Sequence, residues 1–143
     1  MLKFTLDTNT LISATIARGN EFELMRLAKE GKIRIILSLP IIEEFKEVIS
    51  REKFGFSARQ IEQVTKLLFD VCDIVIPTVH LSVIKDDPDD NKLIECAVSG
   101  NVDYIVSGDK HLLNIQKYGN IPIIRTREAL ALINKQDLAQ CTR

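Results

Sequence analysis

A chain of 143 residues, 45% hydrophobic and 27% charged, is long enough for one substantial core and has the composition of an ordinary globular protein. Its formal net charge of -1 excludes a globally basic nucleic-acid-binding protein, so a polyanion would require a local patch or metal ions. The three cysteines have no paired spacing, which argues against a disulfide framework or structural zinc. No signal-peptide pattern or membrane-length apolar run is present, so we expect a soluble, cytoplasmic protein with no membrane partner.

Short apolar runs alternate with segments of helical spacing. The apolar runs predict strands at Lys3–Leu6, Ile33–Leu37, Ile74–Ile76, Tyr104–Val106 and Pro122–Ile124. The spacing predicts helices at Leu11–Ala17, Glu21–Glu30, Ile41–Lys53, Ala58–Cys72, Asp90–Ser99, Lys110–Gln116 and Arg127–Ile133. This alternation is typical of an α/β fold whose mostly parallel sheet is covered on both faces. We expect a single domain over residues 1–143.

The ends of two helices carry recognisable signals. Ser57 and Thr126 stand where N-caps are expected. The polar tail from about residue 134 is expected to fray or to form a short extra helix.

Two acids follow predicted strands directly. Asp7 comes after the first strand, and Asp109 comes shortly after the strand Tyr104–Val106. In parallel sheets the ligand crevice lies at the carboxyl ends of the strands. Both carboxylates are therefore expected at the same edge of the sheet.

Two further acids lie on predicted helices. In PIIEEFKEVI, Glu44 falls on the shoulder of the apolar stripe, whereas Glu43 and Glu47 fall on the opposite, solvated face. In DDPDDNKLIECAV, Asp90 lies on the same side as the apolar stripe and Asp89 is turned aside. We expect Glu44 and Asp90 to face inward.

Each of these acids also has an ordinary structural interpretation. Asp7 and Asp109 can serve as helix caps, Asp90 as a first-turn acid, and Glu44 as a partly covered surface residue. Together, however, four carboxylates in one crevice repel one another, at a cost of roughly 4 kcal/mol for two charges about 4 Å apart at a dielectric constant near 20. A compensating cation is therefore expected. Oxygen ligands without His or Cys indicate Mg²⁺ or Mn²⁺.

Three segments carry a family resemblance: LDTNTLISA, SLPIIEEFKEVI and DPDDNKLIECAVSGNVDYIVSGDKHLL. In this order and spacing the chain resembles PIN domains, and within them the VapC-type toxin nucleases of toxin–antitoxin pairs, over residues 2 to about 127. The resemblance implies a three-layer α/β/α sandwich with a parallel sheet of four or five strands. It also implies Asp7, Glu44, Asp90 and Asp109 as an acidic quartet around one or two Mg²⁺ or Mn²⁺ ions.

The same resemblance implies supporting residues and an activity. Asn9 and Ser107 match polar positions that steady the site, and Asp87 is a candidate acid that supports the metal ligands from behind. The implied reaction is endonucleolytic hydrolysis of RNA that leaves a 5′-phosphate, with Glu44 acting as a metal ligand or orienting the water. An antitoxin protein is the implied partner.

Other residues have two interpretations each. Some basic side chains near the expected site either contact phosphates or form a solvated surface: Arg51, Lys53, Arg59, Lys110 and His111. Phe54 and Phe56, in KFGFS, either form an apolar patch for a second protomer or an antitoxin helix, or are buried under the next helix. We expect a homodimer or a higher homo-oligomer.

Two rival functions remain open at this stage. One is a Mg²⁺-dependent phosphoryl-transfer or receiver-type domain with Asp7 as nucleophile, although DTNT lacks the second acid of DxDxT. The other is a non-catalytic PIN module that binds RNA or a protein.

Overall fold

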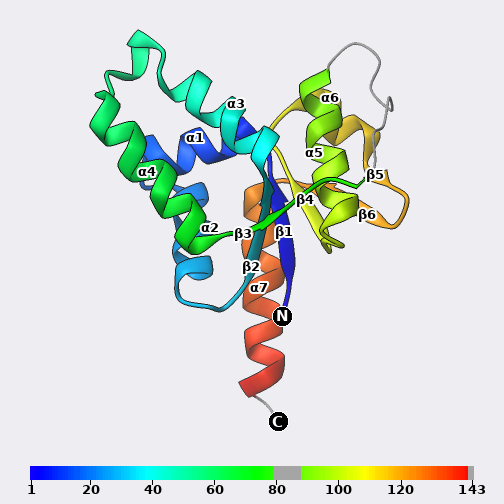
Figure 1. Ribbon diagram of the computed structural model, residues 1–143. Helices are drawn as coiled ribbons and strands as arrows, with labels where there is room; N and C mark the ends of the chain where they lie inside the picture. Colours follow the sequence, from blue (N-terminus) through cyan, green and yellow to red (C-terminus); the bar gives the residue numbers. More distant parts are fainter. Residues whose placement is uncertain (79–87, 142–143) are drawn as a thin grey trace.

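The central sheet of this protein is almost entirely parallel. The computed structural model describes residues 1–78 and 88–141, with side chains other than those of residues 88–90, 140 and 141. Within this part of the chain six strands form one sheet in the order β3-β2-β1-β4-β6-β5 (Figure 1). The strands are β1 (Lys3–Leu6), β2 (Arg34–Ser38), β3 (Asp73–Val75), β4 (Tyr104–Val106), β5 (Lys117–Tyr118) and β6 (Ile121–Ile124).

Helices cover the sheet. Their bounds are α1 (Thr8–Ile16), α2 (Asn20–Lys29), α3 (Leu39–Ile49), α4 (Ala58–Val71), α5 (Pro88–Ser99), α6 (Lys110–Ile115) and α7 (Thr126–Cys141), with a 3₁₀ turn η1 (Glu52–Phe54) before α4. Helix α5 packs against β1, β2 and β4 in front of the sheet, while α7 passes behind it and contacts α2 (Figure 1). Helices α3 and α4 pack together beside the sheet. The predicted α/β class with a covered, mostly parallel sheet is confirmed.

The number of strands and several boundaries differ from the prediction, among them the start of α1 at Thr8 rather than Leu11 and the end of α3 at Ile49 rather than Lys53. The added strand β5 has only two residues and runs antiparallel to β6, and this is too short for an alternating pattern to reveal. Over residues 134–141 the C-terminal segment is part of α7, which continues to Cys141, rather than a separate short helix. Thr126 is the first residue of α7 rather than its cap, and the preceding Arg125 N–H is bound by Glu128 Oε1 at 3.3 Å. Ser57 caps α4 as predicted, in a reciprocal pair with Gln60.

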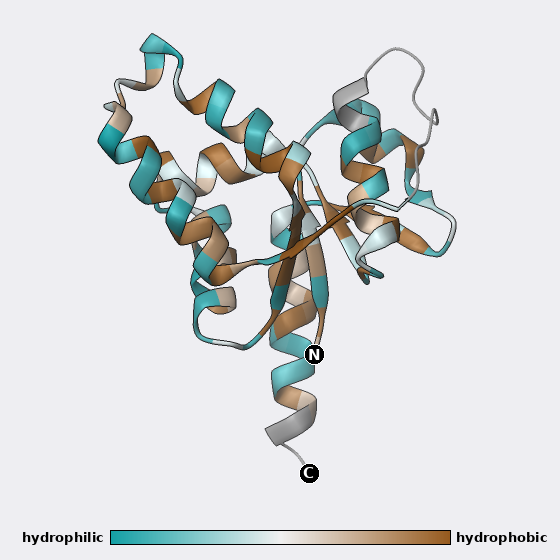
Figure 2. Cartoon of the chain, viewed as in Figure 1, coloured by the Kyte–Doolittle hydropathy of each residue, from teal (hydrophilic) through white to brown (hydrophobic). Residues whose placement is uncertain are grey.

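The strands and the inner stripes of the helices form the core. Figure 2 shows the central strands as mostly hydrophobic and the outer helices with mixed faces. The largest fully buried side chains include Phe4, Leu6, Ile35, Leu37, Ile105 and Phe45. On α4 the apolar residues at helical spacing are Ile61, Val64, Leu68 and Val71; Leu68 is buried and the other three are half-buried. Helix α4 lies on other helices rather than on the sheet, so its apolar stripe is covered less completely.

One glycine sets how closely α5 approaches the sheet. A Cβ on Gly100 would lie 2.6 Å from Ile36 Cγ2 and 3.1 Å from the carbonyl oxygen of Cys96. The first distance is too short for a real Cβ and the second is unusually tight, so glycine lets the end of α5 lie this close to β2.

The strand order has a reversal that positions the site. From β1 the chain adds β2 and β3 on one side, and then β4 and β6 on the other. In open α/β sheets ligands bind outside the carboxyl ends of strands at such a switch point. In this chain the switch lies between β1 and β4. Across residues 1–78 and 88–141, none of the helices combines the length and apolar character needed to cross a membrane.

Candidate acidic nuclease site

Strand register places Asp7 next to Ser107. Strands β1 and β4 are parallel, with Leu6 beside Val106, so the next residue of each strand leaves the sheet at the same level. The Asp7 N–H donates to the Val106 carbonyl at 3.2 Å, which holds the two strand ends together. Asp7 is half-buried and Ser107 is only 1% exposed.

The Ser107 hydroxyl links two of the predicted acids. It donates to Asp7 Oδ2 and accepts the backbone N–H of Asp109 at 3.0 Å. The Ser107 N–H in turn donates to the Ile124 carbonyl at 3.0 Å, which anchors this residue to β6. A buried hydroxyl with both its donor and acceptor functions satisfied is held in one orientation. The structure therefore fixes Asp7 and Asp109 relative to each other.

Asp7 and Asp109 are also helix caps. Oδ1 of Asp7 accepts the N–H of Thr10 at 2.8 Å, and Oδ1 of Asp109 accepts the N–H of His111 at 2.8 Å. The capping interpretation of both residues is thus correct for this structure. Capping does not prevent either residue from binding a ligand. In each aspartate Oδ1 accepts the capping hydrogen bond, and Oδ2 takes no part in that bond. Asp7 Oδ2 is the atom that faces Ser107.

A cavity of about 270 Å³ brings Asp7 and Asp109 together with Glu44. The residues that line it are Asp7, Thr8, Asn9, Ile41, Glu44, Glu47, Val48, Arg51, Leu93 and Asp109. Glu44 is half-buried on α3, whereas its neighbour Glu43 is exposed and does not line the cavity. The structure therefore places three of the four predicted acids on one cavity wall.

Glu47 departs from the prediction that it faces away. It is exposed, yet it lines the same cavity, and its Oε2 lies 3.3 Å from Arg51 Nη2. Glu44, Glu47 and Arg51 are spaced by three and four residues, so they follow one face of α3 and its continuation. Because the cavity extends along this face, the solvated side of α3 contributes to its wall. Of the basic residues considered as phosphate contacts, Arg51 is the one that lines this cavity.

The remaining predicted acids are Asp90 and Asp87. The backbone of Asp90 belongs to the first turn of α5, one turn before Leu93, which lines the cavity. The Asp90 side chain lies outside the described side chains, and Asp87 lies outside the described residues altogether. Their predicted roles stay predictions.

The described side chains do not form a complete metal site by themselves. Among them, no three His, Cys, Asp or Glu residues lie close enough to bind one ion together. Asp7, Glu44 and Asp109 thus share a cavity without converging on a single point. The donor set is nevertheless chemically uniform, since the cavity wall supplies carboxylate oxygens and no imidazole or thiolate. Such a set suits Mg²⁺ or Mn²⁺.

A second cavity of about 530 Å³ adjoins the first and was not anticipated. It is lined by Asn9, Thr10, Ser13, Asn20, Glu21, Ser107, Gly108, Asp109, Arg125, Thr126 and Arg127. Asn9 and Asp109 line both cavities, so the two are neighbours. Sequence reasoning missed the two arginines, although Arg125 directly follows a predicted strand, which is the same signal that identified Asp7.

The aromatic pair in KFGFS has a structural role. Phe54 and Phe56 are half-buried and pack against the core. This favours the interpretation that they are covered by their surroundings rather than displayed as a patch.

Comparison with known proteins assigns the family. The chain matches the PIN domain over residues 3–111, and it belongs to the PIN domain family. Its fold is similar to that of VapBC2 from Rickettsia felis, solved bound to a DNA fragment from its promoter, with a TM-score of 0.62 and 14% identity over 85% of this chain and 97% of that chain. It is also similar to DNA-bound VapBC from Salmonella typhimurium, with a TM-score of 0.61 and 17% identity over 88% of this chain and 99% of that chain. No protein of curated function matches the chain significantly.

Proposed function

We propose that this protein is a Mg²⁺- or Mn²⁺-dependent endoribonuclease that acts as the toxin of a toxin–antitoxin pair. The observation that carries the proposal is the Ser107 hydroxyl, which joins Asp7 and Asp109 where β1 and β4 end, at a cavity that Glu44 also lines. Paired acids held by a buried hydroxyl at the switch point of a parallel sheet suit metal-assisted phosphodiester hydrolysis.

Asp7 and Asp109, together with Asp90, would hold the metal. When bound, the metal lowers the pKa of a water molecule and neutralises charge on the phosphate. Ser107 orients the Asp7 carboxylate by donating to Oδ2, which leaves the other lone pair of that oxygen for an ion. The N–H of Thr10 orients Oδ1 in the same way. These two bonds set the plane of the carboxylate before any ligand arrives, which limits the reorganisation needed on binding.

The proposed reaction is hydrolysis of an RNA phosphodiester bond. The oxygen of water bonds to phosphorus, the bond to the 3′-oxygen breaks, and the products carry a 5′-phosphate and a 3′-hydroxyl. Glu44 is the residue proposed to orient the water and accept its proton, because it is half-buried and lines the same cavity as the paired aspartates.

An antitoxin partner is proposed because both similar structures are VapBC complexes. An apolar cavity of about 180 Å³ between α1, α2 and α4 suits an apolar helix face of such a partner. Its rim includes Phe22 and Leu67, which are 38% and 46% exposed. The test is co-purification with a small protein encoded beside this chain. Leu67→Arg should abolish it, and Phe69→Arg, an equally exposed change on α4 outside this cavity, should not.

The central experiment compares the parent with Asp7→Asn on a labelled RNA. Cleavage should require Mg²⁺ or Mn²⁺, should be blocked by EDTA, and should be lost in Asp7→Asn. Asn caps helices about as well as Asp, so the fold should persist, and loss of one of several like charges should leave the metal-free variant as stable or slightly more stable. Metal should raise the melting temperature of the parent by binding the folded state, and much less that of the variant.

Two outcomes contradict this proposal. Full activity in Asp7→Asn, or equal metal stabilisation of both proteins, would reduce Asp7 to a helix cap. Binding of RNA without metal-dependent cleavage by the parent would instead favour the rival function, a non-catalytic PIN module. The other rival function is a phosphoryl-transfer or receiver-type domain. Membership of the PIN family speaks against it, and its support would require a covalent aspartyl-phosphate.

A further inference from the structure

We propose that the second cavity is a subsite for the RNA backbone next to the bond that is cut, and that Arg125 and Arg127 bind its phosphates. This inference rests on the proposed ribonuclease function and adds to it the residues that hold the substrate beside the acids.

The position of the cavity gives the first argument. It shares two lining residues, Asn9 and Asp109, with the acidic cavity, and Ser107 and Gly108 lie on its wall as well. A strand of RNA with its scissile phosphate at the acids would therefore continue directly into this space. At about 530 Å³ the cavity has about twice the volume of the acidic one.

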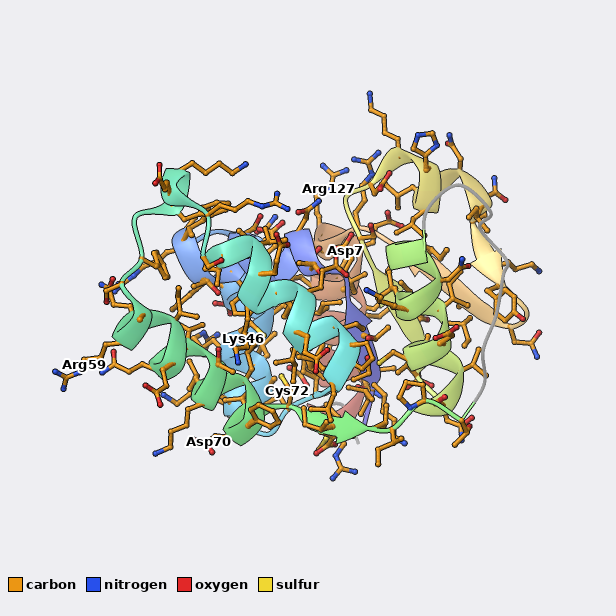
Figure 3. All side chains as sticks on the ribbon, turned by 45° about the horizontal axis from the view of Figure 1, so that its top comes forward. Asp7, Lys46, Arg59, Asp70, Cys72 and Arg127 are labelled. Carbon is orange, nitrogen blue, oxygen red and sulfur yellow. The ribbon has the colours of Figure 1, made fainter. Side chains whose placement is uncertain are left out.

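The sheet gives the second argument. Strands β1, β4 and β6 are neighbours and run parallel, so the residues that follow them leave the sheet at one edge. Asp7 follows β1, Ser107 follows β4, and Arg125 follows β6. Helix α7 begins one residue after Arg125, and Arg127 lies in its first turn. Figure 3 shows Arg127 on the same upper side of the molecule as Asp7.

Charge gives the third argument. Arg125 and Arg127 are exposed, and within the described part of the chain neither forms an ion pair with a carboxylate. The acids Glu21 and Asp109 also line the cavity, but no hydrogen bond joins them to these guanidinium groups among the described residues. Arginine binds phosphate through two parallel N–H groups. In a protein of net charge -1, this pair supplies local positive charge where an acid-lined site alone would repel RNA.

The wall also offers groups for the sugar. Ser13 and Asn20 line the cavity on the side of α1 and α2, with a hydroxyl and an amide respectively. Such groups can bond to the 2′-hydroxyl of ribose, a group that an acidic peptide does not carry. The mixed wall therefore favours RNA over an acidic protein segment as the occupant.

The test measures RNA binding separately from cleavage. In an Asp7→Asn background with Mg²⁺, fluorescence anisotropy follows binding of a fluorescein-labelled, single-stranded RNA decamer over a range of salt concentrations. Arg125→Gln/Arg127→Gln should weaken binding roughly tenfold. It should also reduce the slope of the logarithm of the binding constant against the logarithm of salt concentration by about 1.4, since each phosphate contact to a single strand contributes about 0.7 to that slope. The matched control, Lys29→Gln/Lys66→Gln, removes the same charge from exposed positions on α2 and α4 that line neither cavity, and it should bind as the background does.

Cleavage by the parent distinguishes the two proposals. With Asp7 intact, the arginine double variant should raise KM with little change in kcat, while metal still raises its melting temperature as in the parent. If the parent does not cleave RNA, the proposed function fails, and the binding experiment alone still decides the subsite. Equal RNA binding by the double variant and its background, or an equal loss in the control, would overturn the subsite. Arginine-dependent binding of polyglutamate with no effect on RNA would also overturn it.

Discussion

The hydroxyl of Ser107, at the end of β4, donates a hydrogen bond to Oδ2 of Asp7, at the end of β1. The hydroxyl oxygen of Ser107 also accepts the N–H of Asp109, so one small buried side chain holds two acids that are far apart in the sequence. Both aspartates cap the helices that follow them. The same residues thus serve as caps and as site residues. When a helix begins just after a parallel strand ends, its N-cap lies at the carboxyl edge of the sheet.

Removing this hydroxyl should damage the site more than the fold. Ser107→Ala leaves the Asp109 N–H without its partner and frees Asp7 to rotate, at a cost of about 2 kcal/mol in stability. Metal affinity and cleavage should fall by roughly 10- to 100-fold, as for residues that orient metal ligands. The measurements are denaturant unfolding, metal titration by thermal shift, and the initial rate of RNA cleavage.

Ser107→Thr is the matched rescue variant. It keeps the hydroxyl and adds one methyl group at a position that is 1% exposed. Metal affinity should return close to that of the parent, even if stability falls through crowding. Equal loss of metal affinity in the Ala and Thr variants would mean that packing, rather than the hydrogen bond, explains the effect.

Two adjacent glutamates on α3 should behave differently. Glu44 is half-buried at the acidic cavity, and Glu43 is exposed outside it. Glu44→Gln should lower kcat by about 100-fold or more, in the range expected when a general base is lost. Glu43→Gln makes the same chemical change one residue away and should leave the rate unchanged. Similar rates for the two variants would remove Glu44 from the mechanism.

Gly100 should be among the least replaceable glycines. In Gly100→Ala the new Cβ would meet Ile36 Cγ2 at 2.6 Å, so α5 must move away from β2, at a cost of about 1–3 kcal/mol. Gly19→Ala is the control, because its nearest contact would be Glu21 Oε2 at 3.7 Å. Urea unfolding should show a lower midpoint for the first variant and a near-parental one for the second. An unchanged midpoint for Gly100→Ala would show that the helix has room to move.

The two buried thiols should be inert in the folded protein. Burial raises the pKa of Cys72 to about 12, with a smaller effect from Asp73, and burial also raises the pKa of Cys96. Thiolate is the reactive form, so in Cys141→Ser iodoacetamide at pH 8 should label neither thiol until urea unfolds the chain. Because both thiols are neutral in the fold, they stabilise it fully below pH 9, and this contribution should decline as the pH rises from 9 towards 12. Rapid labelling without urea would contradict the burial of both residues.

The sequence by itself determined the α/β class and most of the element positions. The apolar stripe of α3 predicted that Ile41, Ile42 and Phe45 are buried and that Glu44 is partly covered, because helical periodicity alone assigns faces. Alternation of strands and helices predicted parallel pairing, and parallel strands deliver Asp7 and Asp109 to one edge whatever the details of packing. The quoted segments also identified the PIN family before any fold was known.

Only the tertiary structure determined which side chains from different helices and strands meet. The link from Ser107 to both aspartates depends on the register of β1 against β4, which hydrophobic pattern does not specify to one residue. Glu47 joins the cavity wall because the cavity extends along the solvated face of α3, the face to which helical periodicity assigned this residue. The order of β4 and β6 brings Arg125 beside the acids. Strand order is set by long-range packing, and no local pattern in the sequence encodes it.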